Sequence, residues 1–127
     1  MNMGFQGKRK NSLRKSFSCA SQGIIEALKT ERNIQIHSIV TIVVILVGLF
    51  FSLNWMEWLF ILVAIVGTIT LELVNSAIER VVDLVTEEYH PLAKQAKDIA
   101  AGAVFLYAIF SVIVGIIIFL PKFIRLF

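Results

Sequence analysis

Two long stretches of this chain contain no lysine, arginine, aspartate or glutamate, and this limits what the chain can fold into. The first runs for 24 residues, 33–56, and the second for 23 residues, 99–121. Each can supply the roughly 20 apolar residues that cross a hydrocarbon core of about 30 Å. Hydrophobic residues make up 57% of the 127 residues and charged residues only 17%, which excludes an ordinary soluble domain or a disordered chain. The sequence predicts a single small membrane domain, 1–127.

A third uncharged stretch, residues 58–71, has only 14 residues. Extending it to the roughly 20 residues of a span takes it to Ala77 and brings Glu72 into or beside the membrane. A buried or re-entrant helix is the alternative, but the chain has no soluble domain against which such a helix could pack. We therefore expect an all-α integral membrane protein. Its predicted parts are a basic tail (1–11), an amphipathic surface helix (12–32) and spans at 34–53, 58–78 and 99–120, the second continuing as a cytoplasmic helix to about residue 87.

The basic residues predict the orientation of the chain. Seven of the 12 Lys and Arg residues precede the first span, none lies in the first connector (52–57), three lie in the second connector and two follow the last span. By the positive-inside rule, the N-terminus and the second connector are cytoplasmic. Trp55 and Trp58 then lie at the outer interface, and we expect no cleavable signal peptide.

The segment before the first span has the pattern of an amphipathic helix. Its apolar residues recur every three or four positions: Leu13, Phe17, Ala20, Ile24 and Leu28. With basic residues elsewhere on the wheel, this predicts a helix on an anionic inner leaflet, although packing against the domain's own core is equally compatible with the pattern. The same wheel carries Glu31 to the apolar face, where a carboxylate needs a counter-ion or a metal.

A polar stripe is expected on the second span and its cytoplasmic continuation. On a helical wheel, five polar residues share one side over about 16 Å: Glu72, Asn75, Ser76, Glu79 and Asp83. Such a stripe is costly in a membrane helix and needs compensation. One explanation is ion pairing with basic residues of the cytoplasmic side, namely Arg32, Arg80, Lys94 and Lys97.

We favour ion pairing for Glu87 and Glu88, beside the His90–Pro91 break, and a different explanation for Glu72 and Glu79. A membrane-level acid with an amide and a second acid at i+3 and i+7 suits oxygen ligation of a hard cation together with a proton acceptor. The sequence has no glycine-rich phosphate loop and no protein-kinase signature. Nucleotide chemistry would therefore depend on carboxylates, Mg²⁺ and basic residues on helices.

A zinc site is not expected. His37 and His90 are isolated in the sequence, and Cys19 is the single cysteine.

Three motifs resemble the prokaryotic diacylglycerol kinase family: E-L-V-N-S-A-I-E-R-V-V-D at 72–83, E-Y-H at 88–90 and A-K-D at 96–98. The run T-E-R-N-x-x-I-H at 30–37 is similar to the Gram-positive branch, whose members phosphorylate undecaprenol. The resemblance covers nearly the whole chain. It implies a homotrimer of three-span subunits, with active sites shared between neighbours, in the cell membrane of a bacterium.

The resemblance also implies roles for individual residues. Glu72 matches the general base that takes the proton of the lipid hydroxyl, and Ser76 joins it as a substrate-binding candidate. Glu31 and Glu79 match the carboxylates that hold Mg²⁺ with the ATP phosphates, and Asn75 supports them. The remaining nucleotide-binding candidates are Glu88, Tyr89, His90, Lys97, Asp98 and, from the N-terminal helix, Arg14.

The expected activity is in-line transfer of phosphate from ATP to undecaprenol at the cytoplasmic interface. The base must lie at membrane depth while ATP stays in water. Two alternatives remain: a diacylglycerol kinase that makes phosphatidic acid, and an oligomeric cation pathway lined by Glu72, Asn75 and Glu79. The expected partners are a lipid alcohol, ATP, Mg²⁺, the bilayer and further copies of the chain, with no nucleic acid.

Overall fold

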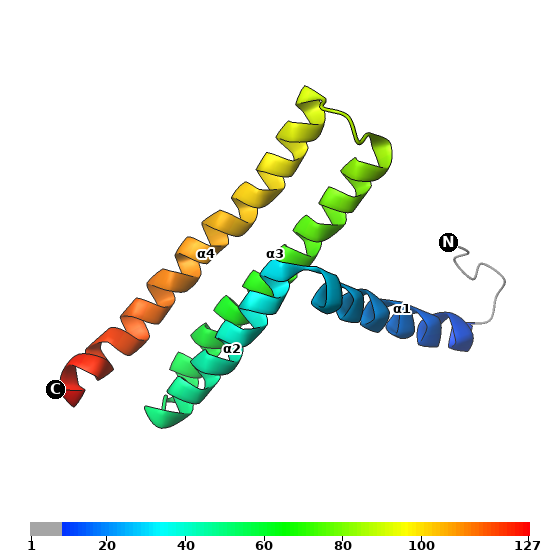
Figure 1. Ribbon diagram of the computed structural model, residues 1–127. Coiled ribbons are helices and arrows are strands. Elements are labelled where there is room, and N and C mark those ends of the chain that lie inside the picture. Colours follow the sequence, from blue (N-terminus) through cyan, green and yellow to red (C-terminus); the bar gives the residue numbers. More distant parts are fainter. Residues whose placement is uncertain (1–8) are drawn as a thin grey trace.

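A computed structural model describes the backbone of residues 9–127 and the side chains from Ser12 onward. The chain forms four helices in this range: α1 (Arg9–Thr30), α2 (Arg32–Phe50), α3 (Trp55–Val85) and α4 (Pro91–Leu126) (Figure 1). The described residues contain no strand, which confirms the all-α prediction. Most of the predicted basic tail lies outside the described residues.

Three of the helices are long and apolar enough to cross a membrane. They are α2 with 19 residues, α3 with 31 and α4 with 36. The short uncharged stretch 58–71 is part of one continuous helix, α3, as expected for a third span. Helix α3 begins three residues before the predicted start of that span. Helix α4 extends beyond the predicted span at both ends.

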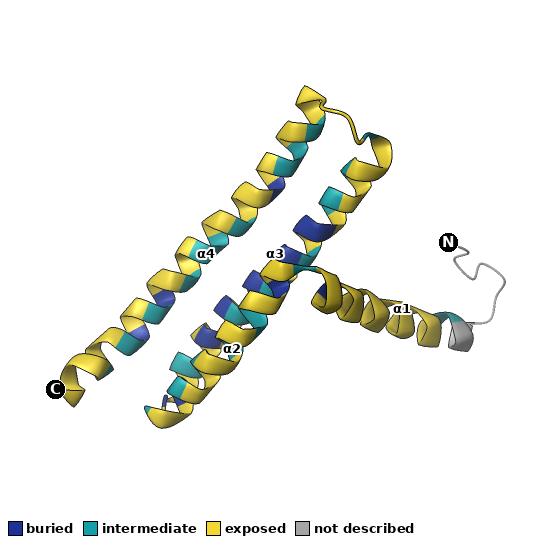
Figure 2. Ribbon diagram, in the orientation of Figure 1, coloured by how far each residue is buried: buried dark blue, intermediate teal, exposed yellow. Residues whose placement is uncertain are grey.

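The distribution of buried residues is unlike that of a soluble protein. Large apolar side chains are exposed along α2, α3 and α4 (Figure 2). Among the residues whose side chains are described, the four buried polar ones all lie on α3: Thr68, Glu72, Asn75 and Ser76. Helix α3 packs against each of the other three helices. A bilayer accommodates exposed apolar surface and penalises exposed polar groups, so this arrangement suits a protein surrounded by lipid.

Helices α2 and α3 are joined by a tight turn. Ser52 has a φ of 52°, and the N–H of Leu53 donates to the carbonyl of Gly48 at the end of α2. Asn54 then caps α3 in a reciprocal pair with Glu57, in which each side chain accepts a hydrogen bond from the other residue's backbone N–H. The four-residue connection turns the chain back on itself, so α2 and α3 run antiparallel.

The second connection lies at the opposite end of α3. Pro91 is the first residue of α4, where its missing N–H costs nothing, and the ring Nδ1 of His90 accepts from the N–H of Leu92 at 3.1 Å. From there α4 runs back along α3 (Figure 1). A cluster of buried apolar side chains holds the far end of the bundle together: Leu53, Ile61, Ala64, Val114 and Ile118.

Helix α1 projects away from the other helices (Figure 1) and contacts α2 and α3 through its C-terminal end. Its predicted apolar stripe is largely exposed, with Phe17 at 70% exposure, while Ala27 is buried. Within one subunit, packing of the stripe against the protein's own core is therefore not observed. The exposed face is free to meet lipid or another copy of the chain.

The helical wheel placed Glu31 on the apolar face of the surface helix. This prediction was wrong, because α1 ends at Thr30, one residue before Glu31. Glu31 has an extended backbone and stands between α1 and α2. The side chain of Gln35, from the first turns of α2, donates to the carbonyls of Leu28 and Lys29 and so satisfies the open end of α1. The surface helix and the first span are separate helices with a direction change at Glu31.

Candidate active site around Glu72 and Glu79

The polar stripe of α3 passes from a buried to an exposed environment. Glu72 is 4% exposed, and Asn75 and Ser76 are also buried. Glu79 is half-buried and Asp83 is exposed. The five residues thus follow the helix from the interior of the protein to its surface, which is the geometry needed to join a lipid hydroxyl to a nucleotide in water.

Glu72 is paired with a histidine from α2. The ring Nε2 of His37 lies 3.3 Å from Oε1 of Glu72. His37 is isolated in the sequence, but the packing of α2 on α3 brings it to Glu72, a residue 35 positions away. Among the described residues, no lysine or arginine forms an ion pair with Glu72.

Asn75 and Glu79 form a second polar pair, one turn further along α3. The amide Nδ2 of Asn75 donates to Oε1 of Glu79 at 3.3 Å. Its amide oxygen, Oδ1, is buried without a hydrogen-bond partner. Such an oxygen is costly unless something binds it. An amide oxygen beside a carboxylate suits Mg²⁺, which prefers oxygen ligands and commonly takes one or two of them from a protein.

Glu31 lies beside the same part of α3. The guanidinium Nη2 of Arg80 donates to Oε1 of Glu31 at 3.1 Å and to the hydroxyl of Thr30 at 2.8 Å. Arg80, which follows Glu79 in the chain, thus holds Glu31 beside α3. No hydrogen bond joins Glu31 to Glu79 in the described structure. No group of three His, Cys, Asp or Glu side chains comes together as a metal cluster within the part of the chain that the structure describes.

Four of the nine predicted nucleotide residues meet in a cleft at the turn between α3 and α4. The cleft has a volume of about 350 Å³, and its lining includes Glu88, Tyr89, His90 and Lys97. Lys97 makes an ion pair with Asp83 of α3, Nζ to Oδ1 at 2.6 Å, and this pair joins the two walls. Asp83 follows Glu79 by one helical turn, about 6 Å along the axis, so the cleft continues the polar stripe.

The ion-pair prediction for Glu87 and Glu88 was wrong. The nearby basic residues pair with other acids: Lys97 with Asp83, Lys94 with Asp98 at 2.6 Å and Arg80 with Glu31. Asp98, a predicted nucleotide residue, thus has Lys94 as its partner one turn away on α4.

Arg14 does not join the nucleotide cleft within one subunit. It is exposed on α1, which contacts α2 and α3 but not α4 among the described residues.

Ser76 lies at a second cleft, next to α1. It lines a cleft of about 330 Å³ between α1 and α3, together with Gly23, Ile24 and Arg80. This cleft lies where the surface helix meets α3. The predicted substrate-binding residue Ser76 therefore lies toward α1.

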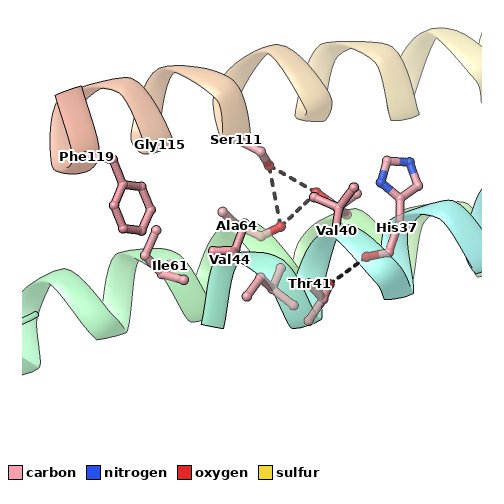
Figure 3. Close-up of a pocket in the computed structure, with 11 residues that line it drawn as sticks. His37, Val40, Thr41, Val44, Ile61, Ala64, Ser111, Gly115 and Phe119 are labelled. Atoms are coloured by element: carbon pink, nitrogen blue, oxygen red, sulfur yellow. Dashed lines mark hydrogen bonds between the residues drawn. The ribbon is translucent and has the colours of Figure 1, made fainter. Parts of the chain in front are cut away.

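His37 stands at one end of an apolar groove between α2, α3 and α4 (Figure 3). Ile61 and Phe119 line its other end. The groove has a volume of about 150 Å³. Between the ends, the hydroxyls of Thr68 and Ser111 lie 3.0 Å apart and link α3 to α4.

Comparison with known proteins identifies the family. The model of the prokaryotic diacylglycerol kinase family matches residues 18–119. Over 112 residues the chain is 49% identical to the undecaprenol kinase of Bacillus subtilis, covering 88% of this chain and 91% of that protein. Over 112 residues it is 42% identical to a diacylglycerol kinase of Synechocystis sp., covering 87% of this chain and 64% of that protein.

A diacylglycerol kinase of Escherichia coli is 26% identical over 92 residues, covering 72% of this chain and 75% of that protein. The matched range includes all three motifs that suggested the resemblance, and the Bacillus relative supports the Gram-positive branch. The chain therefore belongs to the prokaryotic diacylglycerol kinase family, a family of lipid kinases.

Proposed function

We propose that this chain transfers the terminal phosphate of ATP to undecaprenol. The observation that carries the proposal is the order of groups along α3: a buried carboxylate at Glu72, an unpartnered amide oxygen and a half-buried carboxylate one to two turns later, and then the cleft with Lys97. The 49% identity to an undecaprenol kinase supports undecaprenol as the lipid.

Each group has a defined task in this reaction. Glu72 accepts the proton of the lipid hydroxyl, which reaches it from the membrane side. Lys97, at the edge of the cleft, balances phosphate charge, while Tyr89 and His90 line the space for the nucleotide. Transfer of a phosphoryl group needs mainly positioning and charge stabilisation, and a series of helix-borne groups can provide both.

Mg²⁺ would be held by Asn75 Oδ1 and Glu79, with Glu31 close by. When bound, it would supply neutralisation of phosphate charge. Arg80 balances the charge of Glu31.

Location and assembly are part of the same proposal. The positive-inside pattern supports a cytoplasmic N-terminus and a site on the inner face of a bacterial cell membrane. The exposed apolar side chains along the three long helices and the exposed stripe of α1 are compatible with a homotrimer embedded in lipid.

The test is a kinase assay on the purified protein in detergent micelles with labelled ATP. We expect Mg²⁺-dependent transfer of label to undecaprenol. Glu72→Gln should lower kcat by roughly 10²- to 10⁴-fold, the usual contribution of a general base. Glu26→Gln is the matched control, because Glu26 is an exposed acid on α1, away from the stripe. Absence of label in the lipid phase with wild-type protein would refute the proposal.

Diacylglycerol is the second candidate substrate, and the 42% identity to a named diacylglycerol kinase favours it. Both lipids present one hydroxyl at a similar depth, so the ratio of kcat/KM for the two lipids decides between them. A clear preference for diacylglycerol would reverse our assignment. Membership of a lipid kinase family favours either lipid over the cation pathway.

A further inference from the structure

The carboxylate of Glu72 has a different kind of partner from the other paired acids. Five ion pairs join described residues, and in four of them the cation is a lysine or an arginine: Arg80–Glu31, Lys94–Asp98, Lys97–Asp83 and Lys122–Glu57. The fifth is His37–Glu72. The most buried acid is thus the one that meets an imidazole.

This difference matters for a group that must accept a proton. A lysine or arginine beside a carboxylate stabilises its charged form, and so makes it a weaker base. A neutral imidazole N–H donates a hydrogen bond without a full charge. It can therefore orient the carboxylate and offset part of the cost of burying it.

The position of His37 suits this task. It comes from α2, its side chain is 28% exposed, and the side chain of Glu72 is 5% exposed. The other residues lining the groove at His37 are aliphatic, hydroxyl-bearing, glycine or phenylalanine, so they bring no further titratable group to the imidazole (Figure 3). Among the described residues, Glu72 is the charged group that forms a pair with His37.

We propose that His37 is a positioning residue for Glu72, and this inference rests on the proposed kinase function. The Nε2 atom of His37 lies 3.3 Å from Oε1 of Glu72, and this contact holds that oxygen while leaving Oε2 for the lipid hydroxyl. In the transfer, the hydroxyl proton passes to Oε2, the lipid oxygen forms a bond to the γ-phosphorus, and the bond from that phosphorus to the ADP oxygen breaks, with its electron pair leaving on ADP. His37 keeps its proton throughout.

Kinetics of two substitutions test the role. His37→Leu removes the donor, and we expect kcat to fall roughly 10- to 100-fold, the usual effect of losing a hydrogen bond to a charged group, with the KM for ATP changed by less than about twofold. His37→Gln should restore most of kcat, since its amide N–H can reach the same oxygen. An unchanged kcat in His37→Leu, or a His37→Gln variant as slow as His37→Leu, would overturn the proposal.

Ser38→Ala is the matched control on the same helix. The hydroxyl of Ser38 donates to the carbonyl of Ile34, one turn back on α2, and so its contact stays within that helix. We expect kcat and KM to stay within about twofold of the wild-type values. A loss as large as that of His37→Leu would mean that any change in this part of α2 impairs the enzyme, and the proposal would fail.

A measurement without turnover separates this inference from the proposed function. The chain has two histidines, so nitrogen NMR of isotope-labelled side chains in micelles gives two pairs of ring-nitrogen signals, and the pair that disappears in His37→Gln belongs to His37. We expect the Nε2–H neutral form of His37 and a changed signal in Glu72→Gln but not in Asp83→Asn. The Nδ1–H form, or a signal that ignores Glu72→Gln, would refute the contact. Failure of the wild-type kinase assay would refute the function instead.

Discussion

The guanidinium of Arg80 donates to the carboxylate of Glu31 at 3.1 Å and to the hydroxyl of Thr30 at 2.8 Å. One side chain of α3 thereby holds the point at which the surface helix ends and the first span begins. The carboxylate of Glu31 makes no capping hydrogen bond to α2. It accepts a hydrogen bond from Arg80 instead. The direction in which α1 leaves the bundle should therefore depend on Arg80.

We expect Arg80→Gln to loosen α1. Cys19 is exposed on α1 and is the chain's single cysteine, so a nitroxide attached to it reports the motion of that helix. Its electron paramagnetic resonance spectrum should show faster motion in Arg80→Gln than in the wild type. Lys94→Gln is the control, because Lys94 pairs within α4 and α4 does not contact α1 in the described structure. Identical spectra for wild type and Arg80→Gln would contradict the assigned anchor.

Asn75 should be a residue that costs stability and serves function. Its buried Oδ1 has no hydrogen-bond partner, and replacing an unsatisfied buried polar group by an apolar one of similar size is often neutral or stabilising. We expect Asn75→Leu to keep or raise the melting temperature in micelles and to remove most kinase activity. A large drop in melting temperature would show that Asn75 is structural.

Glu79 should control the response to Mg²⁺. Removing divalent cations with a chelator should stop the wild-type enzyme, and adding Mg²⁺ should restore it. Glu79→Gln keeps the shape of the side chain but loses the carboxylate, so we expect turnover to be abolished with the helix content unchanged by circular dichroism. Glu26→Gln should titrate with Mg²⁺ like the wild type. Normal turnover in Glu79→Gln would remove Glu79 from the metal site.

The helices and the polar stripe could be predicted from the sequence because both depend on local order. Uncharged stretches long enough to span a bilayer gave α2 and α4, and the 100° periodicity of a helix put Glu72, Asn75 and Glu79 on one side. The sequence also indicated that such a stripe needs compensation, and the structure provides it in part by burying Glu72 and Asn75.

The contacts between helices could not be predicted in the same way. The pairing of His37 with Glu72 depends on the relative rotation and depth of α2 and α3, which periodicity within one helix does not fix. The pairing of Lys97 with Asp83 depends on which ends of α3 and α4 lie opposite each other. The break at Glu31 has no glycine or proline to mark it; it depends on Gln35 and Arg80, which bind the ends of the neighbouring segments.

The contact between Gly67 of α3 and Tyr107 of α4 provides a further prediction. Tyr107 lies across Gly67, where a Cβ would overlap the ring, and its hydroxyl donates to the carbonyl of Val63 at 2.6 Å. Gly102, also helical, has no atom within 4 Å of the corresponding position. The same change, glycine to alanine, should therefore have opposite effects at the two sites.

At position 102, alanine should stabilise the protein by up to about 1 kcal/mol, because it favours helix more than glycine does. At position 67 it must displace the tyrosine ring and break its hydrogen bond, at a cost of roughly 1–3 kcal/mol. Thermal unfolding in micelles should thus give a raised midpoint for Gly102→Ala and a lowered one for Gly67→Ala. Adding Tyr107→Ala should remove most of the penalty of Gly67→Ala, since the residue that clashes is gone. If the destabilising effects of Gly67→Ala and Tyr107→Ala simply add in the double variant, Tyr107 does not pack on Gly67 and this contact between α3 and α4 is wrong.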